Sequence, residues 1–193
     1  MRTLPGSHTF RYLSLLAAIF GLSSPPRLSA AELTRAEIEE KIGDARGAVI
    51  SLANLALTNA DLAGLNLLGA DFFSTKLSGA TLAKADLSSA NFTRTELQNT
   101  NFSGALMMGA TLYAAELDGA NFSNADLSHA RVIGGGRGFN FNNAKLRNTD
   151  LGADPANQGM VPVRAELPDA NFDGADLTGA NFTHAVLVGA TFT

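Results

Sequence analysis

Hydrophobic residues recur with a period of five through most of this chain. Between Ala60 and Ala130 a Leu or Phe occupies every fifth position except 107, which is Met, and the residue two places before it is in nearly every case small and usually Ala. A period of five matches neither the 3.6 of a helix face nor the 2 of a strand face. Fixed self-similarity of this kind predicts a repeat architecture in which each short unit forms one side of a coil.

Each place in the unit has an expected role. The Leu or Phe is expected to point into the coil, and the small residue two places earlier to face inward at a tight corner. Polar residues between these two, such as Asp61, Asp71 and Asn91, are expected to face water. Glycines such as Gly64 and Gly79 fall two places after a centre, where a turn favours glycine.

The repeated pattern A-[DN]-[LF]-[ST]-G resembles the pentapeptide-repeat family and covers most of the chain from 50 to 193. The resemblance implies an all-β fold, a right-handed quadrilateral β-helix with four pentapeptides per coil. Residues twenty apart should then stack on one side of the square. Under this rule Phe72 and Phe92 share one side, and Phe102 and Phe122 share the opposite side.

The five-residue period is interrupted twice, at 133–138 and at 152–164. If Gly134–Gly138 is a degenerate side of four residues, Phe141 falls below Phe122. If the second interruption contains an eleven-residue loop, Phe172 and Phe192 follow in the same column. Every phenylalanine at a centre then obeys the rule, which favours one continuous tube rather than two.

Residues 1–31 have the pattern of a secretory signal peptide. Arg2 and Arg11 form a basic start, the apolar run Tyr12–Leu22 is too short to span a bilayer comfortably, and small residues end at Ala31. The alternative is an amphipathic or core helix. The next segment, 32–49, is expected to cap the first coil with a short helix at 34–44. Thr34 and Glu37 form its capping box, and Gly43 and Gly47 end it.

The length, the lack of Cys and the net charge limit the kinds of site and partner that the chain can have. The 193 residues suit one domain, and the absence of Cys excludes disulfides and thiolate metal sites. Removal of residues 1–31 takes away three of the 14 basic residues and none of the 18 acidic ones, so the net charge becomes −7. A moderately acidic surface disfavours nucleic acid and anionic membrane as partners, and no membrane insertion is expected after signal removal.

Two places are candidate contact surfaces. The loop at 152–164 interrupts the repeat, and its candidate contact residues are Asp154, Met160, Val161 and Arg164. The alternative for this loop is a neutral insertion. The chain also reaches its last residue, Thr193, within a repeat, so Leu187 and Phe192 are a candidate edge for a homodimer, with a solvated end as the alternative.

Chemistry is not expected at any position. His129 and His184 fall at outer places on different sides, and the pattern suggests no catalytic, cofactor-binding or metal-binding residues. Gly134–Gly138 resembles an anion nest but lacks the strand-to-helix setting and the lysine of a phosphate loop, so a bent corner is the preferred interpretation.

The sequence therefore favours a non-enzymatic protein-interaction or structural module of the bacterial cell envelope, periplasmic or secreted, with an unknown protein partner. In a cyanobacterium the thylakoid lumen is the equivalent compartment. Two alternatives stay open. Some members of the resembling family are cytoplasmic DNA mimics that protect gyrase, a role that needs an acidic stripe which Lys76, Lys84, Arg94 and Arg131 dilute here. The other is an enzyme with a site in the irregular segments, where only Arg137, Asp154 and Arg164 are available.

Overall fold

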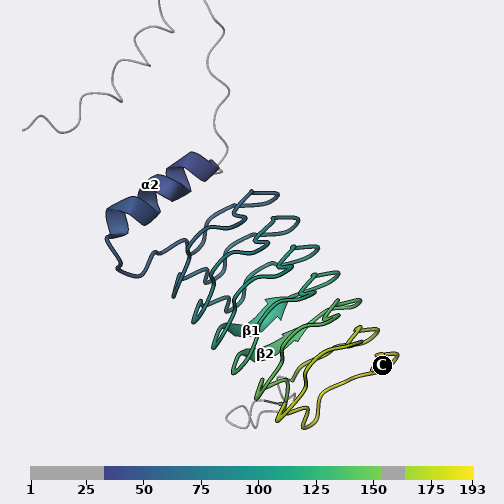
Figure 1. Cartoon of the computed structure of the whole chain (residues 1–193). Coiled ribbons are helices and arrows are strands. Elements are labelled where there is room, and N and C mark those ends of the chain that lie inside the picture. Colours follow the sequence, from purple (N-terminus) through teal and green to yellow (C-terminus); the bar gives the residue numbers. More distant parts are fainter. Residues whose placement is uncertain (1–32, 154–163) are drawn as a thin grey trace, which may run out of the picture. The chain divides into compact units, whose positions relative to one another are not determined.

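The computed structural model of the chain describes residues 33–153 and 164–193. The chain divides into two units, Met1–Ala31 and Glu32–Thr193, and every described residue belongs to the second. The predicted signal peptide lies outside the described residues. The named elements are helix α2 (Arg35–Ala45) and the strands β1 (Thr111–Glu116) and β2 (Arg131–Gly135), which pair in parallel (Figure 1).

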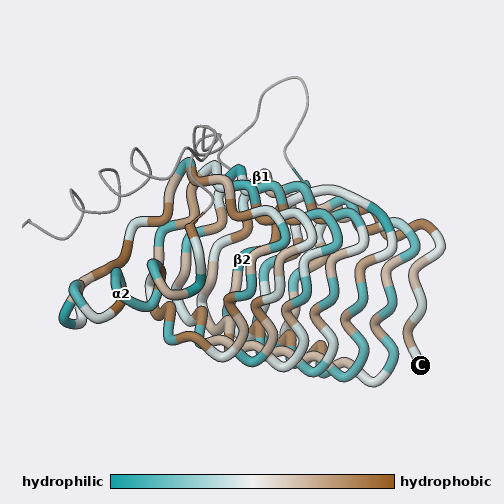
Figure 2. Tube along the Cα trace, turned by 90° about the horizontal axis from the view of Figure 1, so that it is seen from above, coloured by the Kyte–Doolittle hydropathy of each residue, from teal (hydrophilic) through white to brown (hydrophobic). Residues whose placement is uncertain are grey.

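The second unit is the predicted right-handed quadrilateral β-helix. Parallel bridges join residues twenty apart from coil to coil, as in Asp71 to Asn91 and Asn91 to Thr111. The coils stack side by side along the tube, and hydrophobic and hydrophilic residues alternate along each of them (Figures 1 and 2). Four five-residue sides therefore make one coil, as the resemblance implied.

The side Ala90–Arg94 shows the five places of the repeat, for which we use fixed names. Ala90 is the corner residue, Asn91 the pre-centre residue, Phe92 the centre, Thr93 the post-centre residue and Arg94 the turn residue. Ala90 and Phe92 are buried, whereas Asn91 and Thr93 are half-buried and Arg94 is exposed. The inward direction of centres and corners thus agrees with the sequence pattern.

Backbone hydrogen bonds close most of the corners and join the coils. The N–H of Leu82 donates to the carbonyl of Asn101 in the next coil over 2.8 Å, and the N–H of Ala85 donates back to the carbonyl of Leu82 over 3.1 Å. The second bond closes a turn whose third residue, Lys84, has a φ of 58°. A turn with positive φ at this place favours glycine or asparagine, which explains why these residues recur there.

The bridge register sorts the centres onto four faces of the tube. Face 1 contains Leu52, Phe72, Phe92, Leu112, Val132, Leu151 and Phe182. Face 2 contains Leu57, Leu77, Leu97, Leu117, Gly136, Leu167 and Leu187. Face 3 contains Leu62, Leu82, Phe102, Phe122, Phe141, Phe172 and Phe192. Face 4 contains Leu67, Leu87, Met107, Leu127, Leu146 and Leu177. Every phenylalanine at a centre lies on face 1 or on the opposite face 3, as predicted.

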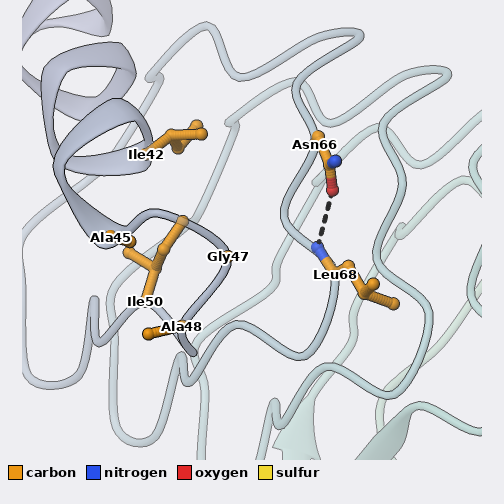
Figure 3. Close-up of a pocket in the computed structure, with 7 residues that line it drawn as sticks. All are labelled: Ile42, Ala45, Gly47, Ala48, Ile50, Asn66 and Leu68. Carbon is orange, nitrogen blue, oxygen red and sulfur yellow. Dashed lines mark hydrogen bonds between the residues drawn. The ribbon is translucent and has the colours of Figure 1, made fainter.

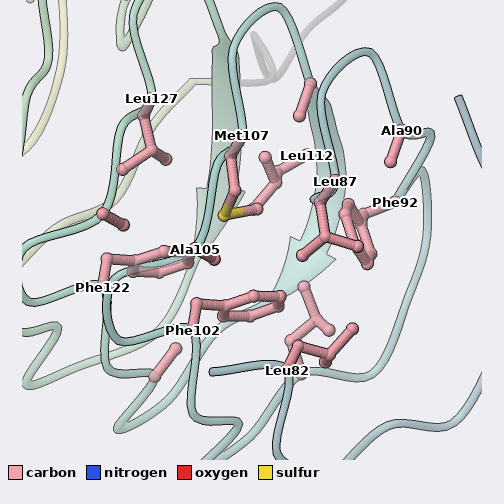
Figure 4. Close-up of a cluster of buried hydrophobic side chains, with 14 of the residues drawn as sticks. Leu82, Leu87, Ala90, Phe92, Phe102, Ala105, Met107, Leu112, Phe122 and Leu127 are labelled. Atoms are coloured by element: carbon pink, nitrogen blue, oxygen red, sulfur yellow. The ribbon is translucent and has the colours of Figure 1, made fainter. Parts of the chain in front are cut away.

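The phenylalanines of face 3 form one continuous stack inside the tube. Ring centroids lie 4.9 Å apart between Phe102 and Phe122, 5.1 Å between Phe122 and Phe141, and 5.0 Å between Phe141 and Phe172. Phe92 of face 1 meets the edge of Phe102 at 5.7 Å across the tube. Figure 4 shows this packing around Phe92, Phe102 and Phe122.

The first irregular segment differs in detail from the expectation. The register is twenty residues at Tyr113 to Ile133 but nineteen at Glu116 to Gly135, so one residue is lost between Ile133 and Gly135. The shortened side is therefore the one centred on Val132, which lacks its turn residue. Gly134–Gly138 itself keeps five residues and does not form the four-residue side that the sequence suggested.

Gly136 occupies a centre and leaves it without a side chain. The N–H of Leu117 donates to the carbonyl of Gly135, and the N–H of Gly119 donates to that of Arg137, so Gly136 lies directly below Leu117. Phe139 takes the next corner, where most sides have alanine, and it is 1% exposed. We infer that its ring fills the volume that the missing centre side chain leaves.

The second irregular segment inserts eleven residues, in agreement with the spacing argument. Bridges before it join residues nineteen or twenty apart, whereas those across it, such as Asn140 to Asn171, join residues 31 apart. Ala153 and Arg164 pair in an antiparallel bridge at the base of the insertion. The phenylalanine columns continue across it, so the coils on both sides belong to one tube.

Helix α2 packs on the first coil as predicted, with a small shift of its bounds. Thr34 is the N-cap, and both hydrogen bonds of the capping box with Glu37 are present. The helix passes through Gly43, contrary to the expectation, and ends where Arg46 adopts a left-handed conformation with a φ of 48°. Ile38 is fully buried, and Ile42 packs at the edge of the same core.

Threonines replace alanine at several buried corners and add a bond between coils. The hydroxyls of Thr75, Thr95, Thr100 and Thr149 donate to the carbonyls of centres in the preceding coil over 2.7–2.8 Å. All four side chains are fully buried. The sequence pattern showed these residues only as small, and it gave no sign of the bond.

We expect Thr75→Val to destabilise the fold more than Thr100→Val. The carbonyl of Leu77 also accepts from Ala80, so loss of the Thr100 hydroxyl costs about 0.5–1.5 kcal/mol. The carbonyl of Leu52 has no other partner within the described ranges, so loss of the Thr75 hydroxyl costs about 1–3 kcal/mol. Urea unfolding of both variants measures the difference. Equal losses would contradict this account.

Candidate functional site

The polar pre-centre residues support the backbone rather than pointing freely into water. Oδ1 of Asp86 accepts the N–H of Ser88 at 3.1 Å, and Oδ1 of Asn91 accepts that of Thr93 at 3.1 Å. Both side chains are half-buried. The expectation that this column simply faces water was therefore wrong for such residues. An Asp or Asn is preferred because its short side chain reaches an N–H two residues ahead.

Polar ladders run between coils on face 1. Nδ2 of Asn91 donates to Asp71 over 2.9 Å, and Nδ2 of Asn181 donates to Asp150 over 2.8 Å. Arg131 lies 3.7 Å from Asp150 and 5.0 Å from the ring centre of Tyr113. These contacts hold the outer side chains that they join in regular rows from coil to coil.

Acidic side chains gather on face 2, and cations of the same face pair with several of them. The carboxylates are Glu96, Glu116, Asp118, Glu166 and Asp169. Ion pairs join Lys76 to Glu96 at 3.5 Å, Arg137 to Asp169 at 3.6 Å and Arg164 to Glu166 at 3.7 Å. Of the four cations named in the sequence argument, only Lys76 shares this face.

The candidate loop is described only at its base. Asp154, Met160 and Val161 lie outside the described residues. Arg164 lies at the base, where it bridges to Ala153 and pairs with Glu166 on face 2. The structure thus places the root of the loop, with Arg164, at the corner between faces 1 and 2.

The last described coil carries the candidate dimer edge. Leu187 is half-buried, and Val188, the next residue in the chain, is 73% exposed. Phe192 is 49% exposed. The backbone N–H groups of Leu177, Phe182 and Leu187 find no acceptor among the residues the structure describes. This edge therefore presents apolar side chains together with free N–H donors.

Face 4 has an apolar surface that the sequence argument missed. Of the six large apolar side chains that are exposed in the described part, Val188 and Phe192 belong to the last coil. The other four lie on face 4: Val49, Leu68, Leu106 and Met108. The signal was available in the repeat itself, because Leu68, Leu106 and Met108 stand at outer places where other sides have polar residues.

The titratable groups of the described part show no gathering around one point. His129 and His184 are exposed turn residues on faces 4 and 1. Within residues 33–153 and 164–193 there is no group of three or more His, Asp or Glu side chains that could hold a metal ion. Nor does any helix in these ranges have the length and hydropathy needed to span a membrane.

Two carboxylates of face 4 have a lowered pKa. Burial raises the pKa of Asp126, but hydrogen bonds from Ser128 and Lys145 outweigh it and hold the pKa below its usual value. Hydrogen bonds from the Thr178 hydroxyl, from Arg147 and from the Thr178 N–H lower the pKa of Asp176 to about 2. Both shifts report structural hydrogen bonding at the surface.

We expect the stabilising effect of the Asp176 charge to disappear in acid. Because its pKa is lowered on folding, the ionised group stabilises the fold above its ordinary pKa near 3.8, and this contribution is lost as the pH falls toward about 2. The difference in unfolding free energy between the wild type and Asp176→Asn should be largest at neutral pH and shrink between pH 4 and 2. Urea midpoints across this range measure it. A difference independent of pH would contradict the assignment.

Comparison with known proteins agrees with the fold. The family model of pentapeptide repeats matches the chain in eight copies, over residues 50–88, 70–107, 105–134 and 164–193. These matches cover more than half of the chain, which therefore belongs to the pentapeptide-repeat family. No curated protein matches the sequence.

Solved structures of other pentapeptide-repeat proteins resemble the chain at low identity. Full-length QnrB1, a plasmid-mediated fluoroquinolone resistance protein, is 18% identical over 74% of this chain and 77% of its own, with a TM-score of 0.43. HetL of Nostoc sp. strain PCC 7120, involved in regulation of heterocyst differentiation, is 22% identical over 82% and 94%, with a TM-score of 0.25. A protein of the Arabidopsis thaliana thylakoid lumen is 29% identical over 68% of each chain, with a TM-score of 0.19.

Proposed function

We propose that the chain is a non-enzymatic protein-interaction module that is exported by a bacterium and acts in the periplasm or as a secreted protein. The observation that carries the proposal is the regular, hydrogen-bonded outer surface. Turns, pre-centre hydrogen bonds and ladders between coils fix the outer side chains in rows, as at Asp71 and Asn91. A fixed surface repeated from coil to coil suits contact with an extended partner, since little conformational entropy is lost on binding.

The export part of the proposal rests on residues 1–31. Their basic start, short apolar run and small residues before Glu32 match a signal peptide. For a cyanobacterial source the thylakoid lumen would be the corresponding compartment. The acidic net charge of the remaining chain supports a protein partner over nucleic acid or an anionic membrane.

A homodimer through the last coil belongs to the same proposal. A regular side donates two N–H groups to the following coil and accepts one from it. In the side Ala90–Arg94, the N–H groups of Phe92 and Arg94 donate, and the carbonyl of Ala90 accepts. Two such donor-rich edges facing each other cannot continue the sheet regularly. The dimer would therefore rest on the apolar side chains Leu187, Val188 and Phe192.

Cell fractionation with N-terminal sequencing of the purified protein tests the proposed compartment. A periplasmic chain that starts at Ala31 or Glu32 is the expected result. A full-length cytosolic chain would overturn the export proposal. Sedimentation equilibrium of the wild type and of Phe192→Asp tests the dimer, which the substitution should convert to monomer.

The second candidate is a cytoplasmic mimic of DNA that protects gyrase. The carboxylates Glu96, Glu116 and Asp118 on adjacent coils of face 2 favour it, because regularly spaced negative charge is what such a mimic requires. Lys76, Arg137 and Arg164 interrupt the same face and reduce its negative field. A gyrase supercoiling assay with fluoroquinolone tests it. Protection that is lost in Glu96→Gln/Glu116→Gln would favour this candidate over the first.

A further inference from the structure

Face 4 carries an apolar stripe along the first half of the tube. Its members are Val49, Leu68, Leu106 and Met108, which are 68%, 57%, 49% and 49% exposed. Leu68 and Met108 occupy the same post-centre place two coils apart, so they lie about 10 Å from each other along the tube axis. Leu106 and Met108 flank the buried centre Met107, so both project outward from one side of one coil.

The surface of the stripe is uneven as well as apolar. Ser88 and Ser89 separate Leu68 from Met108, and a depression lined by these serines continues past Met108 and Gly109 to Ser128 and His129. A second depression lies between α2 and the first coil, lined by Ile42, Ala45, Ala48, Ile50 and Leu68 among others (Figure 3). Leu68 and Met108 therefore stand as ridges beside hollows, the surface form into which the side-chain ridges of a helix pack.

One edge of the stripe is acidic. Asp86 lies in the pre-centre column between Asn66 and Leu106, and no cation within the described residues pairs with it. Asp126 lies in the same column two coils after Asp86 and pairs with Lys145 at 3.3 Å. A ligand that covers the apolar positions would bring its own flank against Asp86, which favours a basic flank.

The width and length of the apolar stripe indicate what kind of partner could cover it. The three outward places of a side span about 10 Å, and four coils span about 20 Å. A strip of this size is far below the roughly 800 Å² per partner that a stable dimer buries, which argues against a second copy of the chain. It matches one α-helix, which is about 10–12 Å wide and advances about 10 Å in seven residues.

We propose that the apolar stripe of face 4 docks an amphipathic helix of a partner protein, with leucine-like side chains at i, i+3, i+4 and i+7 and lysine or arginine on its flank. The helix lies along the tube axis. Its apolar residues enter the hollows on both sides of Met108, and its basic residues approach Asp86. This site refines the proposed interaction role, on which it rests, but it does not depend on the compartment.

A synthetic fluorescein-labelled leucine–lysine peptide of eighteen residues with this spacing tests the proposal in a fluorescence anisotropy titration of chain 32–193, the expected exported form. The chain should bind the peptide in the micromolar range, and Met108→Asp should weaken binding at least tenfold. Thr58→Asp adds the same negative charge at an exposed post-centre place of face 2 and should leave binding unchanged. Both positions are exposed, and matching thermal unfolding curves check that both variants fold.

The sign of the Met108→Asp effect separates docking from nonspecific charge attraction. The substitution adds a negative charge, so purely electrostatic association with the basic peptide would strengthen. Stronger or unchanged binding, or equal losses in Met108→Asp and Thr58→Asp, would overturn the proposal. A leucine–glutamate peptide of the same spacing should bind at least tenfold more weakly. If Met108→Asp instead converts a dimer to monomer in sedimentation equilibrium, the stripe is a contact between copies and the helix proposal is wrong.

These outcomes are distinguishable from failure of the export proposal. Peptide binding is measured on purified protein and does not depend on where the chain resides in the cell. A cytosolic chain that binds the peptide through Met108 would overturn only the compartment, whereas a periplasmic chain without such binding would overturn only the helix site.

Discussion

Phe122→Ala should lower the free energy of unfolding by about 3–5 kcal/mol. Phe122 is fully buried and lies between two parallel rings, 4.9 Å from Phe102 and 5.1 Å from Phe141. The interplanar angles are 1° and 10°, so the rings stack with little tilt. Because the backbone of each coil is hydrogen-bonded to the coils on both sides, the walls cannot close around the cavity.

Phe122→Leu is the matched control. Leucine already occupies the same place in two earlier coils, at Leu62 and Leu82. The substitution should therefore cost only about 1–2 kcal/mol. Urea unfolding followed by circular dichroism measures both variants. A loss below 1 kcal/mol for the alanine variant, or equal losses for the two, would show that the stack contributes little.

Phe139→Ala should cost about 3–5 kcal/mol, although alanine is the usual residue at this place elsewhere in the tube. The reason is the neighbouring centre, Gly136, which has no side chain. Phe139 is almost fully buried and lies 6.1 Å from Phe141, with the rings tilted by 32°. Its removal would leave both the corner and the centre of this side empty, a larger cavity than a single truncation creates.

Restoring a normal centre should not rescue the loss. A Cβ at Gly136 would lie 2.5 Å from the backbone nitrogen of Asp118 and 2.9 Å from the carbonyl carbon of Leu117, and its φ of 151° is strained for other residues. Gly136→Leu/Phe139→Ala should therefore be less stable than Phe139→Ala alone. Gly138→Ala is a control, since no atom lies within 4 Å of its Cβ and only its φ of 68° resists substitution. It should cost about 1–2 kcal/mol.

Thermal and urea unfolding of these three variants measure the compensation between Gly136 and Phe139. Recovery of stability in the double variant would mean that the backbone at Gly136 can move, and that the glycine is not required by close approach of the adjacent coil. A small loss in Phe139→Ala would mean that its ring does not fill the volume of the missing centre.

The sequence by itself determined the repeat, the columns and the length of the insertion. Each side obeys the same local rule, so a centre such as Phe172 can be assigned by counting residues once the coil length is known. The stack from Phe102 to Phe192 follows from that count, and so does the register of 31 across the insertion. Thr34 and Glu37 determined the start of α2 in the same local way.

Only the tertiary structure decided which side chain of one coil fills a space or satisfies a hydrogen bond in another coil. Phe139 enters the core because the centre that it faces, Gly136, is empty, and Gly136 is required by the backbone of Leu117 and Asp118 nearly twenty residues earlier. The hydroxyl of Thr75 likewise finds its acceptor at Leu52 in another coil. A five-residue pattern with a known coil length specifies which places stack, but it does not specify how a side chain of one coil fills a volume or finds a hydrogen-bond acceptor in another.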